Sequence, residues 1–171
     1  MKRNPTILFL LILMTAASLF SKPLAVGDPA PKLIVTTHTG ESLDLGEVYA
    51  KGPVVVYFYP KSDTPGCTKQ ACNLRDNYSD LQAAGVQVVG VSTDSVKDQE
   101  AFREKYNLPF LLVADPDKEL GKAFGTGSLL GMAYKRQTFL IVDGKIAWRD
   151  LKAKPATQSA DALAALKALG D

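Results

Sequence analysis

The hydrophobic residues of the chain are grouped into short runs that polar turns separate. After the first 21 residues, residues 53–59 form the most continuous run, and most of them are β-branched or aromatic. Such a run predicts a strand that is buried on both faces. After a polar turn, apolar residues recur at helical spacing, which predicts a helix over residues 66–84. The apolar positions that define this helix are Ala71, Leu74, Tyr78 and Leu81.

The same patterns predict the remaining elements, with a small hairpin at the start and a closing hairpin around an Asp-Gly turn. Strands that alternate with helices and end in a hairpin imply an α/β fold, with a mixed central sheet flanked by helices on both faces. The further strands are expected over residues 33–37, 42–45, 86–92, 110–114, 137–142 and 145–151, and the further helices over 95–106, 118–124 and 158–169.

The first 21 residues follow a different pattern. Lys2 and Arg3 precede an uncharged, mostly apolar run over residues 6–20. This layout is typical of a secretory signal peptide, and the run is shorter than the about 20 residues that span a bilayer. We therefore expect residues 1–21 to be a signal peptide with a cleavage point between 17 and 25. The domain over residues 26–171 is then exported, to the periplasm, unless the run is retained as a membrane anchor.

The rest of the chain is balanced in charge and has the composition of one globular domain. The full chain is 46% apolar and 22% charged. Without Lys2 and Arg3, 18 of the 20 basic residues remain, against 18 acidic residues. The chain has no basic block and no bases interleaved with aromatic residues. This composition argues against a nucleic acid as a partner.

Both cysteines, Cys67 and Cys72, lie near the start of the helix predicted after the central strand. Five residues along a helix separate two Cα atoms by about 8–9 Å, whereas a disulfide needs about 4.4–6.8 Å. The pair is therefore unbonded, or it forms a disulfide only when the helix start unwinds. Cys67 continues the apolar stripe and should face the sheet. Cys72 lies about 140° around the helix and should face outward.

The surroundings of Cys67 favour a reactive thiol. Helix N-termini and nearby cations stabilise the thiolate, which is the nucleophilic form of cysteine. Arg136, just before a predicted strand, is the best candidate for such a cation. Thr64 can cap the helix and present its hydroxyl beside the sulfur, and Pro60 can end the strand and screen the site. His38, the only histidine, lies in a turn and is expected to be solvated.

The segment from Tyr59 through Thr64 to Cys67 has the pattern Pro-x3-Thr-x2-Cys directly after an apolar strand. It resembles the active-site motif of the peroxiredoxins. Cys72 resembles the second cysteine of the Q-type peroxiredoxins, which are also called bacterioferritin comigratory proteins. Further segments, at residues 89–94, 111–124 and 136–141, fit the same family, and the likeness covers about residues 26–169.

This resemblance implies a thioredoxin-like fold and a thiol-dependent peroxidase that acts on hydrogen peroxide and organic hydroperoxides. Cys67 would be the peroxidatic cysteine, which becomes a sulfenic acid, and Cys72 the resolving cysteine, which forms a disulfide with it. Thr64, Arg136 and Pro60 would polarise and shelter the peroxide. The resemblance further implies a thioredoxin-like dithiol as reductant, no metal or organic cofactor, and a monomer or weak homodimer.

Two other functions share this fold. An exported thiol-disulfide oxidoreductase acting on protein thiols would use Cys-x2-Cys, whereas this chain has Cys-x4-Cys. A copper-binding thioredoxin-like module would use both cysteines and a histidine, and His38 lies far away in sequence. The apolar loop with Leu129 and Leu130 either lines the pocket mouth and favours alkyl hydroperoxides, docks a partner, or packs on the core.

Overall fold

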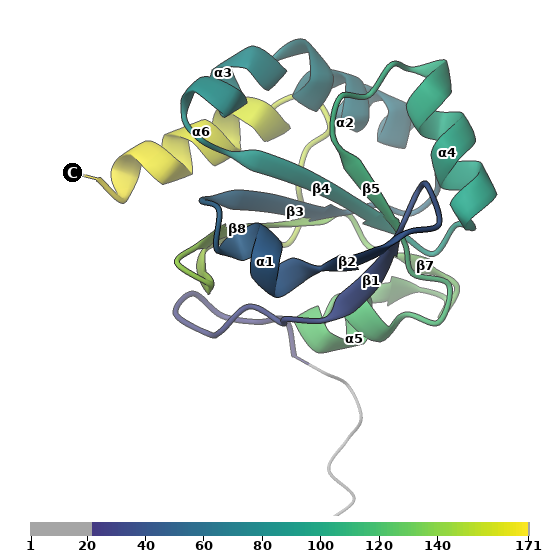
Figure 1. The fold of residues 1–171 in the computed structure, drawn as a ribbon, viewed down its shortest axis with the longest axis horizontal. Helices are drawn as coiled ribbons and strands as arrows, with labels where there is room; N and C mark the ends of the chain where they lie inside the picture. Colours follow the sequence, from purple (N-terminus) through teal and green to yellow (C-terminus); the bar gives the residue numbers. More distant parts are fainter. Residues whose placement is uncertain (1–21, 171) are drawn as a thin grey trace, which may run out of the picture.

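The computed structural model describes residues 22–170, so the predicted signal peptide lies outside the described residues. A seven-stranded sheet forms the centre of the molecule (Figure 1). Its strands are β1 (Ile34–Thr37), β2 (Ser42–Asp44), β3 (Val54–Phe58), β4 (Gln87–Ser92), β5 (Leu111–Ala114), β8 (Gln137–Val142) and β9 (Lys145–Asp150). Their order across the sheet is β2-β1-β5-β4-β3-β8-β9. β3, β4 and β5 run parallel, and the other pairings are antiparallel.

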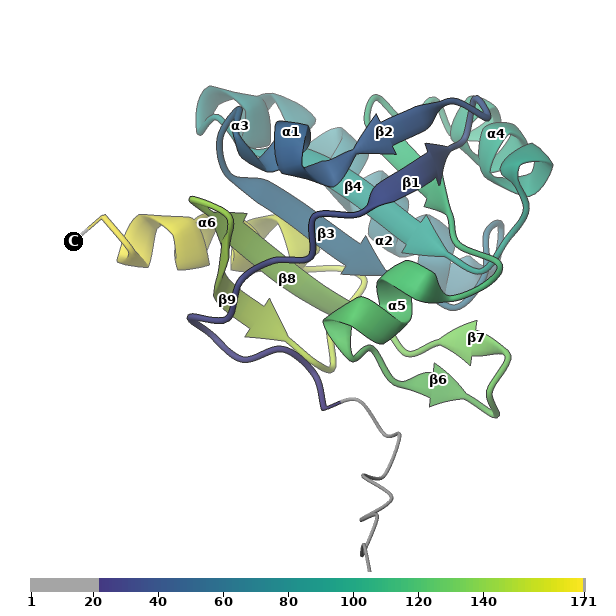
Figure 2. The ribbon, with the colours of Figure 1, turned by 60° about the horizontal axis from the view of Figure 1, so that its bottom comes forward.

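Helices cover both faces of the sheet, as the sequence predicts. Within residues 22–170 they are α1 (Leu45–Tyr49), α2 (Pro65–Asp76), α3 (Tyr78–Ala83), α4 (Val96–Lys105), α5 (Glu119–Phe124) and α6 (Gln158–Ala168). α2, α3, α4 and α6 pack on one face, whereas α1 and α5 pack on the other (Figures 1 and 2). The mixed α/β sheet predicted from the sequence is therefore confirmed.

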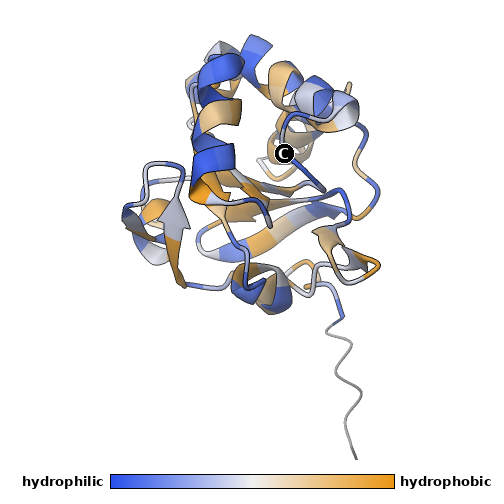
Figure 3. Cartoon of the chain, turned by 90° about the vertical axis from the view of Figure 1, so that its right-hand side faces the viewer, coloured by the Kyte–Doolittle hydropathy of each residue, from blue (hydrophilic) through white to orange (hydrophobic). Residues whose placement is uncertain are grey.

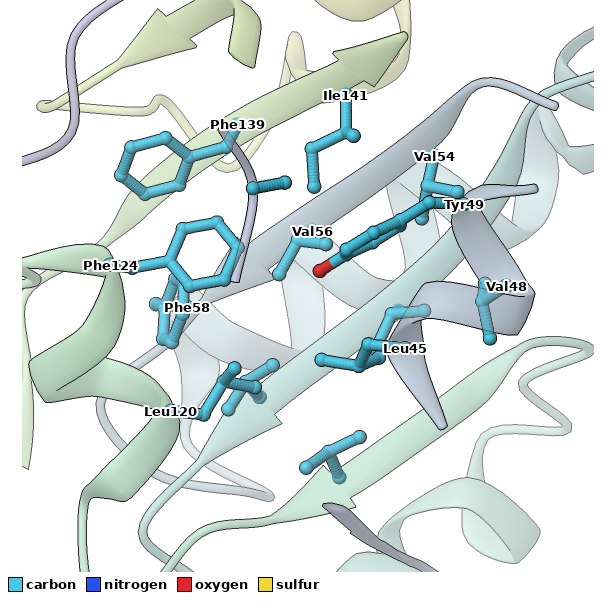
Figure 4. Packing of buried hydrophobic residues seen from close by; sticks show 14 of the residues in the cluster. Leu45, Val48, Tyr49, Val54, Val56, Phe58, Leu120, Phe124, Phe139 and Ile141 are labelled. Carbon is cyan, nitrogen blue, oxygen red and sulfur yellow. The ribbon is translucent and has the colours of Figure 1, made fainter. Parts of the chain in front are cut away.

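The central strand β3 contributes to both hydrophobic cores. Val54, Val56 and Phe58 point into the core beneath α1 and α5 (Figure 4), and Val55 and Tyr57 point into the core beneath α2 and α4. All five residues are fully buried, which explains why every position of the strand is apolar. Figure 3 shows the resulting layers, with hydrophobic strands inside and hydrophilic outer turns on the helices.

The prediction of a single helix over residues 66–84 is wrong, because the helix is interrupted at Asn77, between α2 and α3. The side-chain amide of Asn77 donates to the carbonyl of Asn73 at 2.8 Å. In a continuous helix the backbone N–H of residue 77 would make this bond, so the side chain competes with the helix. Two elements form where no regular structure is predicted: α1, and a hairpin of β6 (Ser128–Leu129) and β7 (Ala133–Tyr134).

The expectation that His38 is solvated is also wrong, because this side chain is only 7% exposed. The pairing of β1 with β5 continues one residue further, and the His38 N–H donates to the Leu112 carbonyl at 2.8 Å. The Leu112 N–H points back to His38 Nδ1 at 3.5 Å. Burial is the main reason why the pKa of His38 lies below its ordinary value of 6.5, and the nearby charge of Arg103 adds to the effect.

The first described residues are fixed to the body of the domain. The N–H of Leu24 donates to the Phe124 carbonyl at 3.1 Å. The Arg149 guanidinium donates to the carbonyl of Pro23 at 2.9 Å and to that of Leu24. No helix in residues 22–170 combines the length and the apolar character that crossing a bilayer requires.

Candidate active site

Cys67 lies in the first turn of α2, at the carboxyl end of β3. Pro65 occupies the first helical position, where its missing N–H costs no hydrogen bond. The N–H groups of Gly66 and Cys67 follow, and the first turn of a helix offers them no carbonyl partner. The Cys67 side chain is 2% exposed. The local chain therefore places a buried sulfur beside unpaired backbone donors.

The turn before α2 is anchored to residues at the two ends of α4. Asp63 adopts a positive φ of 58°. Its carboxylate accepts from Lys105 Nζ at 2.7 Å and from Tyr106 Oη at 2.6 Å, and these bonds lower the pKa of Asp63. One residue earlier, the Ser62 N–H donates to Asp94 Oδ2 at 2.7 Å. These contacts fix the path of the chain between β3 and Cys67.

Arg136 reaches the sulfur, as the sequence predicts. In the antiparallel pairing of β3 with β8, Phe58 lies opposite Gln137, so Arg136 stands at the end of β3 that leads to the site. Its Nη2 donates to Cys67 Sγ at 3.4 Å. An ideal Cβ on Gly66 would lie 3.1 Å from the same nitrogen, so the absent side chain of Gly66 leaves room for the guanidinium.

The structure places Thr64 and Pro60 beside the site, with one correction. Thr64 is the N-cap residue of α2, but its side chain makes no capping bond, contrary to the sequence expectation. Its hydroxyl donates instead to the Lys61 carbonyl at 2.9 Å, which leaves the oxygen lone pairs as acceptors. Pro60 is half-buried and follows Tyr59, the last fully buried residue of the β3 segment.

Both cysteines are free thiols on the same intact helix. Cys67 is buried, and Cys72 is partly exposed. The helix keeps their Cα atoms about 8–9 Å apart. A disulfide between them requires α2 to unwind over this stretch.

A buried chain of polar side chains, which sequence reasoning missed, continues from Arg136 into the core. Arg136 Nη1 donates to Gln70 Oε1, and Gln70 Nε2 donates to Gln158 Oε1. Gln158 Nε2 in turn donates to Thr138 Oγ1. Gln70, Thr138 and Gln158 are at most 2% exposed. The chain holds the guanidinium from behind while its other amino group faces the sulfur.

Tyr57 lies in the same buried cluster as Cys67. Its hydroxyl has no hydrogen-bond partner among the described residues. Burial raises the pKa of Tyr57 far above its ordinary value. The hydroxyl therefore stays protonated.

The predicted site residues do not line the cavity between β1 and α5, and they are not grouped as metal ligands. A cavity of about 480 Å³ lies between β1 and α5, and none of the predicted site residues lines it. Among residues 22–170, no three His, Cys, Asp or Glu side chains are grouped to hold a metal ion. His38, which the copper alternative requires as a ligand, is buried beside Leu112 on β5.

A thioredoxin-like sheet with a buried thiol at a helix N-terminus, faced by an arginine, defines a thiol-based oxidoreductase. The AhpC/TSA family profile matches residues 26–149. The putative peroxiredoxin Bcp of Coxiella burnetii is 48% identical over 122 residues, which cover 68% of this chain and 80% of the relative. The chain therefore belongs to the AhpC/TSA family, as a peroxiredoxin of the Bcp or Q type.

Solved structures give the same result. Peroxidoxin BcpB of Mycobacterium tuberculosis has a TM-score of 0.81 and 34% identity, and the match covers 85% of this chain and 98% of that one. The bacterioferritin comigratory protein of Xanthomonas campestris, whose structural study concerns alkyl peroxide reduction, has a TM-score of 0.77 and 30% identity. That match covers 86% of this chain and all of the other. The predicted peroxiredoxin fold and family are confirmed.

Proposed function

We propose that Cys67 attacks the peroxide and that Cys72 resolves the oxidised product. As a peroxiredoxin, the enzyme is a peroxidase that reduces peroxides with electrons from thiols. One observation carries the assignment to Cys67: its sulfur lies 3.4 Å from Arg136 Nη2, at the start of α2. This arrangement supplies positive charge and backbone donors at one point.

In the first step, the Cys67 thiolate attacks one oxygen of the peroxide. A sulfur–oxygen bond forms as the O–O bond breaks, and the second oxygen leaves with the electron pair and takes a proton. Sulfur is oxidised to a sulfenic acid, and the peroxide is reduced to water or an alcohol. Arg136 and the N–H groups of the first turn donate to the negative charge on the oxygens. Thr64 accepts from the peroxide O–H through its free lone pairs.

In the second step, the Cys72 thiolate attacks the sulfur of the Cys67 sulfenic acid. The S–S bond forms as the S–O bond breaks, and hydroxide leaves and is protonated to water. A dithiol then reduces this disulfide by two exchange reactions and becomes a disulfide itself. We assign this role to a thioredoxin-like protein. We further propose that the enzyme is a monomer or a weak homodimer.

We also propose a compartment and a substrate range. Residues 1–21 direct export, so the enzyme works in the periplasm with a dithiol supplied there. Hydrogen peroxide and organic hydroperoxides are both substrates. Alkyl peroxide reduction by the Xanthomonas relative supports the second class. So do the exposed side chains of Leu129 and Leu130 on the β6–β7 hairpin, which leads directly to Arg136.

The test is stopped-flow oxidation of the reduced protein by hydrogen peroxide and by tert-butyl hydroperoxide. Cys67→Ser should show no turnover. Cys72→Ser should react once, at the wild-type rate, and then stall as a sulfenic acid or a mixed disulfide. Full peroxidase turnover by Cys67→Ser would refute the assignment. A stoichiometric reaction with a protein disulfide, without peroxide consumption, would instead favour the oxidoreductase alternative.

A further inference from the structure

Three hydrogen bonds join the middle of α2 to the start of α6 and to the turn before it, and none of them touches a reacting atom. Asn73 Oδ1 accepts from the Ser159 N–H at 2.9 Å, and Asn73 Nδ2 donates to the Ala156 carbonyl at 3.0 Å. Gln70 Nε2 donates to Gln158 Oε1. We call Gln70 and Asn73, with their partners Ala156, Gln158 and Ser159, the α2–α6 clasp.

Asn73 acts as the N-terminal cap of a helix to which it does not belong. α6 begins at Gln158, and its own N-cap residue, Thr157, makes no side-chain capping bond. The N–H of Ser159, in the first turn, has no carbonyl partner within the helix. Asn73 accepts from this N–H in place of the local residue. The start of α6 and the middle of α2 are therefore stabilised together.

Disulfide formation must break this clasp. Gln70 lies between Cys67 and Cys72 on α2, and Asn73 follows Cys72 directly. When α2 unwinds over this stretch, Gln70 leaves Gln158. Because Gln158 is only 2% exposed, its amide loses a partner that water cannot readily replace. The unwound helix also withdraws the cap from α6.

We propose that the α2–α6 clasp sets the rate at which α2 unwinds, and thereby the fate of oxidised Cys67. This inference rests on the proposed roles of the two cysteines. After unwinding, the Cys67 sulfenic acid and the Cys72 thiol form a disulfide and release water. While α2 is still intact, the sulfenic acid attacks a second peroxide. A second S–O bond forms as the O–O bond breaks, water or an alcohol leaves, and Cys67 becomes a sulfinic acid. A tighter clasp favours the second outcome.

Asn73 is a positioning residue, because its side chain bonds to α6 and not to Cys67 or Arg136. The test compares Asn73→Ala with Lys69→Ala, an exposed position on the same helix outside the clasp. The first readout is amide hydrogen exchange of the reduced full chain over residues 68–76, which involves no peroxide. Loss of an N-cap should accelerate exchange about 10-fold in Asn73→Ala. Lys69→Ala should exchange like the wild type.

The second readout follows the reaction itself by fluorescence of Trp148, the only tryptophan, which lines a cavity together with Thr157 and Asp161 at the start of α6. After a peroxide pulse, Asn73→Ala should form the disulfide about 10-fold faster. Its rate of initial Cys67 oxidation should not change. At excess peroxide, mass spectrometry should find a smaller sulfinic acid fraction than in the wild type.

Asn73→Asp keeps the oxygen acceptor for Ser159 and loses the amide donor, so it should keep most of the protection of residues 68–76 from amide exchange. It also replaces Asn73→Ala as the test variant if Asn73→Ala does not fold. Exchange in Asn73→Asp as fast as in Asn73→Ala, or no difference between Asn73→Ala and Lys69→Ala, would overturn the clasp. Faster exchange without faster disulfide formation would overturn its control of the reaction. Peroxidase turnover by Cys67→Ser would refute the proposed function instead, and the exchange measurement would still stand.

Discussion

Replacing Gly66 with alanine tests the approach of Arg136 to Cys67 without changing either residue. The ideal Cβ at position 66 would lie 3.1 Å from Arg136 Nη2. Unstrained contacts between heavy atoms begin at about 3.5 Å, so the guanidinium must move by a few tenths of an ångström. Arg136 is also bonded to Gln70 on its other amino group, which limits how it can move. The new methyl group therefore pushes the donor away from the sulfur.

The expected effect on activity is opposite to the effect on stability. Removing a whole preorganised donor slows catalysis by about 10²–10³-fold. A displaced donor should cost less, about 10-fold in the rate of Cys67 oxidation, or about 1.4 kcal/mol. Alanine is favoured over glycine inside a helix by up to about 1 kcal/mol. The free energy of unfolding of Gly66→Ala should therefore stay the same or rise.

The assay is single-turnover oxidation of the reduced protein by hydrogen peroxide in a stopped-flow instrument, with urea unfolding in parallel. In an Arg136→Leu background, Gly66→Ala should cause no further loss, because the methyl group then has no guanidinium to displace. An oxidation rate of Gly66→Ala within twofold of the wild type would contradict the argument. So would an equal loss with and without Arg136.

Three further predictions concern other parts of the molecule. The fold lowers the pKa of His38 relative to the unfolded chain, so His38 costs the folded state no stability above about pH 6.5. As the pH drops below that value, the unfolded chain binds more protons at this residue and stability falls. His38→Gln should flatten this loss in urea unfolding between about pH 7 and pH 5, and an unchanged slope would count against it. Tyr57→Phe removes a buried hydroxyl that has no partner among residues 22–170 and should raise the free energy of unfolding by about 1 kcal/mol, whereas a lower free energy of unfolding would contradict this reasoning. Leu129→Ser with Leu130→Ser should slow the reaction with tert-butyl hydroperoxide more than that with hydrogen peroxide, and equal effects would rule out an apolar pocket mouth.

The parts of the site that local patterns define could be predicted from the sequence. A fully apolar strand followed by Pro65, Gly66 and Cys67 specifies a thiol at a helix start. Arg136 precedes a strand, and the pairing of that strand with β3 brings it to the same edge. Both inferences depend on periodicity and on the way in which parallel and antiparallel strands meet at one end of a sheet.

The parts that depend on distant pairs could not be predicted. Gln70 meets Gln158 across 88 positions, and Asn73 meets Ser159 across 86. Glutamine and asparagine are usually exposed, and nothing in their own neighbourhoods marks them as buried. His38 is misjudged for the same reason, because only the pairing of β1 with β5 covers it. In each case tertiary contacts decide the environment of a side chain that local sequence describes as polar surface.

The anchored start of the described chain limits where the proposed signal peptide could be cut without the loss of contacts to the folded domain. A cut after Ala25 would delete Pro23 and Leu24, and with them both carbonyl partners of the Arg149 guanidinium. A cut at or before Ser21 would leave these bonds intact. The residues that directly follow the proposed signal peptide already contact the folded domain. A peptidase acting too far along the chain would produce a protein with an unpaired arginine on β9.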